Sequence, residues 1–242
     1  MNMRWACRDG VGHRARAQHA FAVQVDLVVR VEQHPAAHVE LPPAAQQQRA
    51  AREFGLEYVT LYAFSSENWK RPREEVDDLM GLLRIYLKRE ISELNSQGVR
   101  LRFIGRRETL APDIISLLSQ SELMTANNDG LTLIIALNYG SQAEIARAAR
   151  KLAEEVAAGV LLPEDIDAQA VANRLETAGI PDPDLMIRTS GEKRLSNFLL
   201  WQAAYAELVF LDTCWPDFTR DDLAAAINEY NQRDRRYGGR HG

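Results

Sequence analysis

From about residue 58 onward, short apolar runs alternate with longer amphipathic segments, and this alternation constrains the fold more than any other feature of the sequence. Each apolar run has the length and the residue types of a buried strand. Strands that alternate with helices predict one α/β domain, with a mostly parallel central sheet surrounded by helices. Strands are expected at residues 58–64, 99–104, 131–137, 184–187 and 208–211.

The intervening segments carry start and stop signals of helices. Gly98 follows a long amphipathic stretch and is expected to end it, and Pro112 suits the first position of the next helix. Ser141 and Thr219 are expected to cap helices at their N-termini. Helices are therefore expected at residues 74–97, 112–124, 141–158, 167–178 and 219–238.

The composition of the chain changes near residue 50. Four of the five histidines precede it, and the first lysine is Lys70. We therefore treat residues 1–49 as an atypical N-terminal segment, loosely packed or partly strand, and residues 50–242 as the α/β domain. Within the first segment, the alternating stretch at residues 21–31 is the best candidate for a strand.

Net charge and hydropathy narrow the classes of partner. A net charge of −5 does not favour nucleic acid, so an anionic ligand would need a local cluster of arginines or backbone amides. No apolar stretch reaches the roughly 18–20 residues of a membrane span. We expect a cytoplasmic protein, with any contact to the inner face of the membrane being peripheral.

Two polar segments follow predicted strands, at the strand ends where parallel sheets bind ligands. Residues 65–72, SSENWKRP, combine hydroxyls, an amide, a carboxylate, an indole and two cations. An ordinary capped loop would have a similar composition. Residues 188–198, RTSGEKRLSNF, place basic side chains around Gly191, where guanidinium groups and backbone amides suit a diphosphate. A solvated basic loop is the alternative.

Glu207 lies between apolar residues at the start of a predicted strand. A carboxylate in such a place either pairs with a nearby arginine or ligates a hard cation. Spacing alone favours the ion pair.

Long stretches of the chain resemble the signature segments of the cis-prenyltransferases, in particular the bacterial undecaprenyl diphosphate synthases. The resemblance covers roughly residues 50–240 and is specific, because two long motifs occur in the family's order and spacing. The matching segments are YAFSSENWKRP at 62–72, IRTSGEKRLSNFLLWQAAYAEL at 187–208, WPDF at 215–218 and RRYGG at 235–239.

The resemblance implies an enzyme that condenses isopentenyl diphosphate with an allylic diphosphate such as farnesyl diphosphate. It further implies Mg2+ as cofactor, a homodimer, and a polyprenyl product such as the undecaprenyl cell-wall lipid carrier, held in an apolar tunnel. Ala63 and Leu131 stand at positions that the family uses for the tunnel wall.

The roles of individual residues follow from the same resemblance. Arg188, Arg194 and Ser196, with Leu195 beside them, would hold the diphosphate of isopentenyl diphosphate, and Glu207 would help to ligate magnesium.

On the allylic side, Asn68 would orient the condensing carbon or assist removal of a proton. Trp69 and Arg71 would shape the allylic site. Ser65, Ser66 and Glu67 would lie beside Asn68.

The N-terminal segment departs from the family, which carries an Asp-Gly-Asn-Gly-Arg-Trp-Ala loop for magnesium and the allylic diphosphate. Here only fragments occur, around Asp9 and around Asp26. We therefore predict that no carboxylate from residues 1–49 takes the magnesium position with normal geometry. Two readings follow, an enzyme that turns over weakly on its own, or a non-catalytic partner subunit or impaired homologue of the same fold.

Overall fold

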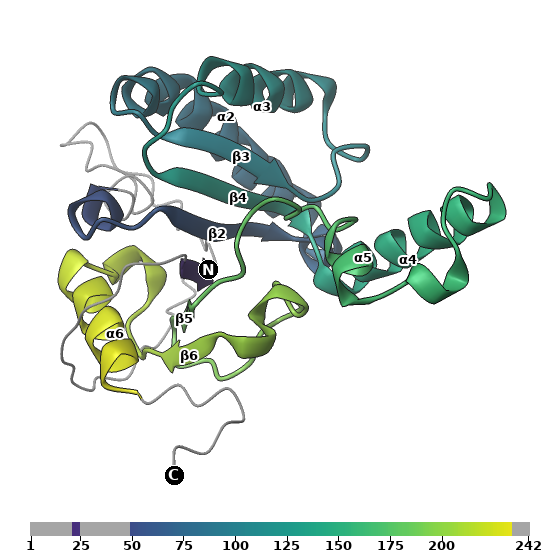
Figure 1. Cartoon of the computed structure of the whole chain (residues 1–242). Helices are drawn as coiled ribbons and strands as arrows, with labels where there is room; N and C mark the ends of the chain where they lie inside the picture. The colour runs from purple at the N-terminus through teal and green to yellow at the C-terminus, as the bar shows by residue number, and fades with distance from the viewer. Residues whose placement is uncertain (1–20, 25–48, 234–242) are drawn as a thin grey trace, which may run out of the picture.

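The structure, a computed structural model, describes residues 21–24 and 49–233. Its described strands form one fully parallel six-stranded sheet in the order β3-β4-β2-β1-β5-β6 (Figure 1). The predicted mostly parallel α/β sheet is confirmed. The strands are β1 Phe21–Gln24, β2 Tyr58–Ser65, β3 Arg100–Ile104, β4 Thr132–Tyr139, β5 Leu185–Arg188 and β6 Glu207–Phe210.

The strand expected within residues 21–31 is present as β1, and it lies in the middle of the sheet. Phe21 is in register with Val59 of β2 on one side and with Leu185 of β5 on the other. At its far end, Gln24 is in register with Arg188. A segment with atypical composition therefore supplies a central element. Residues 25–31 lie outside the described residues.

Most of the expected helices are found close to their predicted limits. The first helix stops before Gly98, which adopts φ of +71°, and Thr219 accepts a hydrogen bond from the amide of Asp222 as the predicted cap. The predicted end at residue 238 lies outside the described residues. The helices are α2 Arg73–Ser96, α3 Pro112–Met124, α4 Ser141–Ala157, α5 Ala168–Ala172 and α6 Arg220–Gln232.

The helix expected at 167–178 is wrong in length, because α5 ends at Ala172. Beyond it, the amide of Glu176 donates to the Oε1 atom of Glu144 at 2.8 Å instead of to a helical carbonyl. The Glu176 carboxylate also binds the amide of Gly105 and the side chain of Arg147. These tertiary hydrogen bonds compete with helical ones and hold the segment in turns.

The two faces of the sheet are covered differently. Helices α2, α3 and α6 pack on one face and bury a large apolar cluster with the strands (Figure 1). The opposite face carries a smaller cluster, in which Tyr62, Ile134 and Met186 pack under Phe198 and Leu199 of the chain after β5. The second polar segment thus covers one face of the sheet while it leads away from the sheet's edge.

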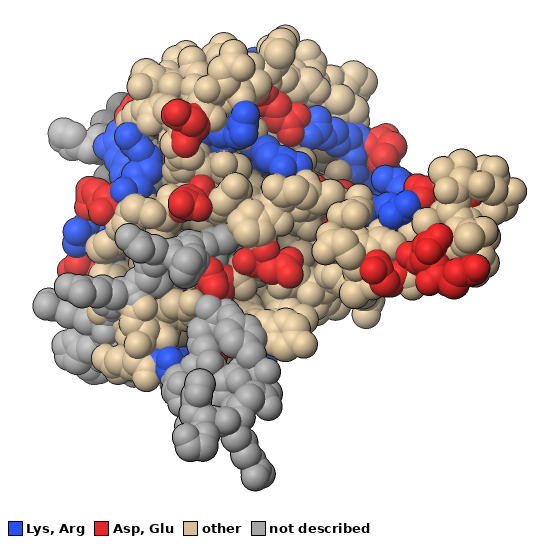
Figure 2. All heavy atoms as spheres, in the orientation of Figure 1, with Lys and Arg blue, Asp and Glu red and all other residues tan. Residues whose placement is uncertain are grey.

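The surface carries side chains of both charges, and the described helices give no sign of a membrane span. Figure 2 shows acidic and basic side chains interspersed on the face that it draws. Within the described part of the chain, no helix is both long and apolar enough to cross a membrane.

Candidate active site

The carboxyl ends of the six parallel strands share one edge of the sheet, and both polar segments begin there. Ser65 is the last residue of β2, Tyr139 of β4 and Arg188 of β5. Ligands of open parallel sheets bind at this edge. The parallel topology therefore brings together two segments that lie more than a hundred residues apart in the chain.

The pairing of β2 with β4 becomes irregular just before this edge. Tyr62 is in register with Ala136, Phe64 with Leu137 and Ser65 with Tyr139, so Ala63 and Asn138 have no partner in the ladder. Such bulges turn the side chains that follow them. Here they set the directions of Ser65 and of Asn138.

The first polar segment, η1 Ser66–Lys70, is closed by its own hydrogen bonds. The amide of Ser65 donates to Oδ1 of Asn68 at 2.8 Å, and the amide of Arg71 donates to the carbonyl oxygen of Asn68 at 3.0 Å. The guanidinium of Arg71 pairs with Glu75 in the first turn of α2 at 2.5 Å. Asn68 is therefore the local organiser of this turn.

Trp69 is held in place from β4. Its Nε1–H donates to Oδ1 of Asn138 at 2.7 Å, and the Nδ2 group of Asn138 donates to the carbonyl of Arg106 and to Oγ1 of Thr109, both at 2.7 Å. Trp69 remains 39% exposed. An aromatic side chain is thus fixed, and partly exposed, at the edge of the sheet.

The second polar segment has an unusual backbone. Among the described residues, left-handed φ values occur at five non-glycine positions, and four of these lie between 190 and 199. Each costs free energy that the surrounding structure must offset, and such residues cluster at functional sites. The four are Ser190 (67°), Ser196 (46°), Asn197 (62°) and Leu199 (44°).

Gly191 adopts the left-handed conformation, with φ of 67°. Its amide donates to the carbonyl of Leu211 at 2.9 Å, and the amide of Ser190 donates to that of Thr213 at 2.8 Å. These two amides tie the segment to the chain after β6. The expectation that backbone amides around Gly191 approach an anion stays a prediction.

Helix α4 anchors the same segment through its first residues. The amide of Ser141 donates to the carbonyl of Asn197, and the amide of Gln142 to its Oδ1, both at 2.8 Å. Oγ of Ser141 accepts from the amide of Leu200 at 2.9 Å. The N-cap is Gly140, so the expectation that Ser141 caps the helix is wrong. Ser141 instead forms hydrogen bonds with the backbone of the segment after β5.

An aromatic cluster supports the segment from beneath. The ring of Phe198 is fully buried and stacks on Tyr62 at 4.4 Å between centroids, with Tyr139 edge-on to both. The hydroxyl of Tyr139 donates to the buried carboxylate of Glu144 at 2.7 Å. Burial, with the charge of Glu144, raises the pKa of Tyr139 far above its usual value. Tyr139 is therefore a neutral donor at any physiological pH.

The two polar segments meet at Glu67. Its Oε1 atom accepts hydrogen bonds from Nδ2 of Asn197 and from Oγ of Ser66, both at 3.1 Å. Gly140 lies against this contact, since a Cβ atom there would stand 2.4 Å from Oγ of Ser66 and 2.8 Å from Nδ2 of Asn197. Burial raises the pKa of Glu67, but its hydrogen bonds outweigh burial and leave it lowered. Glu67 is therefore a carboxylate at neutral pH.

The predicted cationic residues differ in depth. Arg188 is 3% exposed at the end of β5, whereas Arg194 is exposed and pairs with Glu192. Leu195 packs against the smaller apolar cluster beside Ser196. The structure thus places one guanidinium inside the edge of the sheet and a second one on the surface of the segment.

The comparisons with known proteins identify the family of the chain. A family profile described as "Putative undecaprenyl diphosphate synthase" matches residues 21–238. The chain belongs to this prenyltransferase family. Isoprenyl transferases of Rhizobium meliloti and Brucella suis are 56% and 58% identical to it over 191 residues, which is 79% of this chain and 77% and 75% of theirs. It is therefore a transferase of prenyl groups.

Solved structures of the family share the fold. Lavandulyl diphosphate synthase from Lavandula x intermedia, in complex with dimethylallyl diphosphate, has a TM-score of 0.78 and 31% identity, over 91% of this chain and 97% of that one. A "probable undecaprenyl diphosphate synthase" from Campylobacter jejuni has a TM-score of 0.73 and 33% identity, over 81% and 90%.

Glu207, which the family resemblance assigns to magnesium, begins β6 at the amino end of the sheet. It is in register with Leu185, whereas Arg188 is in register with Phe210 at the other end of the strand. Its Oε2 atom pairs with Arg233 at 2.7 Å. The ion pair that spacing favoured is therefore present, and within one chain the structure does not bring Glu207 to Arg188.

The described residues do not assemble a metal site at the edge of the sheet. Among them, no group of three or more His, Cys, Asp or Glu side chains could hold a metal ion. Asp9 and Asp26 lie outside the described residues. The described residues therefore supply no metal cluster that is complete within themselves, and the prediction for residues 1–49 stays a prediction.

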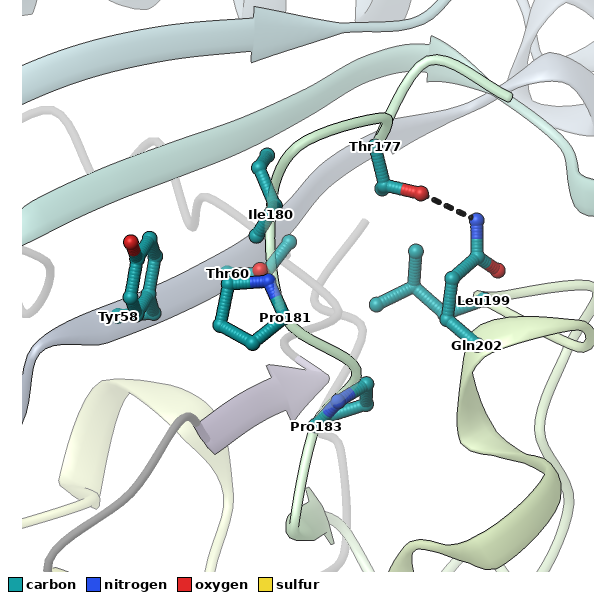
Figure 3. A pocket seen from close by; sticks show the side chains of 8 residues that line it. All are labelled: Tyr58, Thr60, Thr177, Ile180, Pro181, Pro183, Leu199 and Gln202. Carbon is teal, nitrogen blue, oxygen red and sulfur yellow. Dashed lines mark hydrogen bonds between the residues drawn. The ribbon is translucent and has the colours of Figure 1, made fainter. Parts of the chain in front are cut away.

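A small pocket lies away from the predicted site residues (Figure 3). It is about 290 Å³ in empty volume, and the segment around Pro181 and Pro183 lines it together with Tyr58 and Thr60 of β2. Gln202 stands at its side and donates to Thr177 at 2.9 Å. Its lining is mainly apolar and includes none of the predicted site residues, although Leu199 and Gln202 belong to the family-like segment at 187–208.

Three residues of the candidate site are not predicted from the sequence, namely Asn138, Gly140 and Asn197. Asn138 and Gly140 flank Tyr139 at the end of the most apolar strand, and this position was a readable signal. Asn197 was inside a recognised motif, but its partners are 55 and 130 residues away. Its role could be seen only once the sheet was assembled.

Proposed function

We propose that this chain catalyses cis-prenyl chain elongation, in which isopentenyl diphosphate condenses with an allylic diphosphate such as farnesyl diphosphate. The observation that carries the proposal is the meeting of the two family motifs at Glu67 and Asn197, at the carboxyl edge of the sheet. The buried residue Arg188 ends β5, which β1 separates from β2 at the same edge of the sheet. With Trp69, these residues supply polar groups, an aromatic side chain and a guanidinium along one edge of the sheet.

The reaction breaks the allylic carbon–oxygen bond, and pyrophosphate leaves with the electron pair. A carbon–carbon bond forms to isopentenyl diphosphate, which then loses a proton to restore a double bond. Arg188, Arg194 and Ser196 would hold the diphosphate of isopentenyl diphosphate through charge-assisted hydrogen bonds. Asn68 would orient the condensing carbon, with ionised Glu67 next to it.

Magnesium is proposed as the cofactor on family resemblance. When bound, it would neutralise charge on the departing pyrophosphate. Mg2+ in proteins is commonly held by one or two carboxylates together with substrate phosphates. Glu207 remains the proposed protein ligand, although it is paired with Arg233 within the chain.

The product is proposed to be a polyprenyl diphosphate such as the undecaprenyl cell-wall lipid carrier. Ala63 and Leu131 both contact the large apolar cluster under α2 and α3, where a tunnel wall is proposed. A homodimer working in the cytoplasm, with peripheral membrane contact through its product, completes the proposal. Light scattering that gave a monomer at micromolar concentration would count against the dimer.

Two measurements on the purified chain test the function. Calorimetry should detect binding of isopentenyl diphosphate. Incorporation of radiolabelled isopentenyl diphosphate, with magnesium and farnesyl diphosphate, should be weak, because residues 1–49 are predicted to supply no normal magnesium carboxylate. Absence of binding would refute the function. Robust turnover would support it and refute the prediction for residues 1–49. Binding without any turnover would favour the partner-subunit reading.

Replacement of Arg194 by Ala tests the isopentenyl site. Loss of one charge-assisted contact of about 1.5–3 kcal/mol should weaken binding of isopentenyl diphosphate about ten- to a hundred-fold. Arg150→Ala on the exposed surface of α4 is the control and should bind as the unmodified chain does. An unchanged dissociation constant for Arg194→Ala would remove this residue from the site.

A further inference from the structure

The side chain of Asn197 connects three elements at once. Its Oδ1 accepts from the amide of Gln142 at the start of α4, and its Nδ2 donates to the carboxylate of Glu67 in η1. Its own backbone belongs to the segment after β5, and its carbonyl accepts from Ser141. One amide therefore joins the two segments that would hold the two substrates.

The chemistry of the partners fixes which way the amide points. A backbone N–H can only donate and an ionised carboxylate can only accept, so the oxygen must face Gln142 and the nitrogen must face Glu67. Aspartate at this position would lack the donor, and an apolar side chain would lack both groups. Asparagine also tolerates the left-handed backbone, here with φ of 62°, better than most residues do.

Gly140 makes the same contact close. The space that a Cβ atom would need at Gly140 is taken by Ser66 and Asn197. The two segments therefore approach each other across a glycine, and the amide bridge closes the gap. The lack of space for a Cβ atom at Gly140 and the matched donor and acceptor partners of Asn197 are two independent signs that this contact is specific.

We propose that Asn197 is a positioning residue that couples the allylic segment at 66–70 to the isopentenyl segment at 188–199. It acts through Glu67 and through the backbone of Ser196, and it contacts neither reacting carbon. This inference rests on the proposed function and deepens it, since it names what holds the two substrate segments in mutual register. Loss of the bridge should weaken the isopentenyl site and loosen both segments together.

Four variants separate this role from a general effect on stability. Asn197→Gly keeps the left-handed backbone and removes the amide. Asn197→Asp keeps the acceptor for Gln142 and sets a second carboxylate against Glu67. The double variant Asn197→Asp with Glu67→Gln exchanges donor and acceptor and restores the hydrogen bond. Asn128→Ala removes another amide bridge, from Asn128 to Val99 at 2.7 Å, at the amino end of β3.

Calorimetric titration with isopentenyl diphosphate gives the first readout, because it needs no turnover. Asn197→Gly should weaken binding about ten-fold, which corresponds to one hydrogen bond to a charged group. Asn197→Asp should weaken it further, and the double variant should bind better than Asn197→Asp. Asn128→Ala should bind as the unmodified chain does, even where it unfolds more easily.

Amide hydrogen exchange without ligand gives the second readout. Asn197→Gly should increase exchange in peptides covering both 66–70 and 194–200, whereas Asn128→Ala should increase it near 95–101. Unchanged exchange at 66–70 in Asn197→Gly would refute the coupling, whether or not the chain binds isopentenyl diphosphate. Failure of the unmodified chain to bind would refute the proposed function and leave the exchange result to decide the coupling. Where the unmodified chain binds isopentenyl diphosphate, an unchanged affinity in both Asn197→Gly and Asn197→Asp would also refute the coupling.

Discussion

The two segments at the carboxyl edge of the sheet are stabilised in opposite ways. The segment at 66–70 closes on itself, through hydrogen bonds from Ser65 and Arg71 to Asn68. The segment at 188–199 depends on distant elements, namely the start of α4, the chain after β6 and the aromatic cluster. It also carries four of the five non-glycine residues that adopt a left-handed backbone among the described residues.

This difference shows where each geometry is encoded. A locally closed turn forms from a few neighbouring residues, so removal of a distant contact should loosen it less than it loosens a strained segment. A strained segment holds its shape only while packing over-determines it. Changes in the surroundings should therefore harm the isopentenyl segment first, and changes within 65–71 should stay local.

Phe198→Ala should have the largest effect. The ring is fully buried and stacked on Tyr62, and removal of such a side chain costs about 3–5 kcal/mol of unfolding free energy. Denaturant unfolding would measure this loss, with Phe198→Leu as the milder control. Because the ring lies under the strained backbone, binding of isopentenyl diphosphate should also weaken. A loss below about 1 kcal/mol would contradict the supporting role of the cluster.

Gly140→Ala should come next. Its new Cβ would overlap Ser66 and Asn197, and overpacking of this kind costs about 1–3 kcal/mol. The two segments should be pushed apart, so affinity for isopentenyl diphosphate should fall although no binding group is removed. Gly81→Ala in α2, where a Cβ meets nothing within 4 Å, is the matched control. Equal behaviour of the two variants would contradict the close contact.

Asn68→Ala should cost about 1 kcal/mol, the usual loss for a capping side chain. The loss should show in thermal unfolding and in faster exchange confined to residues 65–71. Because this turn is closed locally, binding of isopentenyl diphosphate should remain close to that of the unmodified chain, while any turnover falls. Weakened binding comparable to that of Gly140→Ala would show that the two segments are less distinct than proposed.

The smallest effect should be a pH dependence from Glu67. Its folded pKa lies below its usual value, so its stabilisation is complete above the unfolded pKa and is lost as pH falls through the folded one. Glu67→Gln should therefore flatten the acid limb of stability below about pH 4.3, measured by denaturant unfolding at several pH values. An identical acid limb in both proteins would contradict the lowered pKa.

The sequence predicted what depends on local pattern. The strands were read from short apolar runs, and the end of α2 from Gly98, whose positive φ suits glycine. The predicted helix is absent at residues 173–178 because the amide of Glu176 donates to the side chain of Glu144, a residue distant in the sequence. Ser141 looked like a cap because its contacts with Asn197 and Leu200 are not visible in the chain order.

The sequence predicts which residues belong to the candidate site, but it does not predict their hydrogen-bond partners or where in the sheet they lie. The family motifs named Ser65 to Arg71 and Arg188 to Ser196, and the parallel sheet brings their starting points to one edge. The engaged amides of Ser190 and Gly191 and the position of Glu207 depend on strand register. Register is set by packing between elements, which periodicity within one element does not encode.

The central place of β1 bears on how the chain acquires its fold. β1 lies between β2 and β5 in the described sheet order, and Phe21 is in register with Leu185. During synthesis from the N-terminus, β1 emerges early, but it cannot pair with β5 until most of the chain has been made. Such distant pairing is slow to form, since the closure of a long loop precedes any gain from the contact. The last step to join the two halves of the sheet is then also the step that creates the edge where both substrate segments meet.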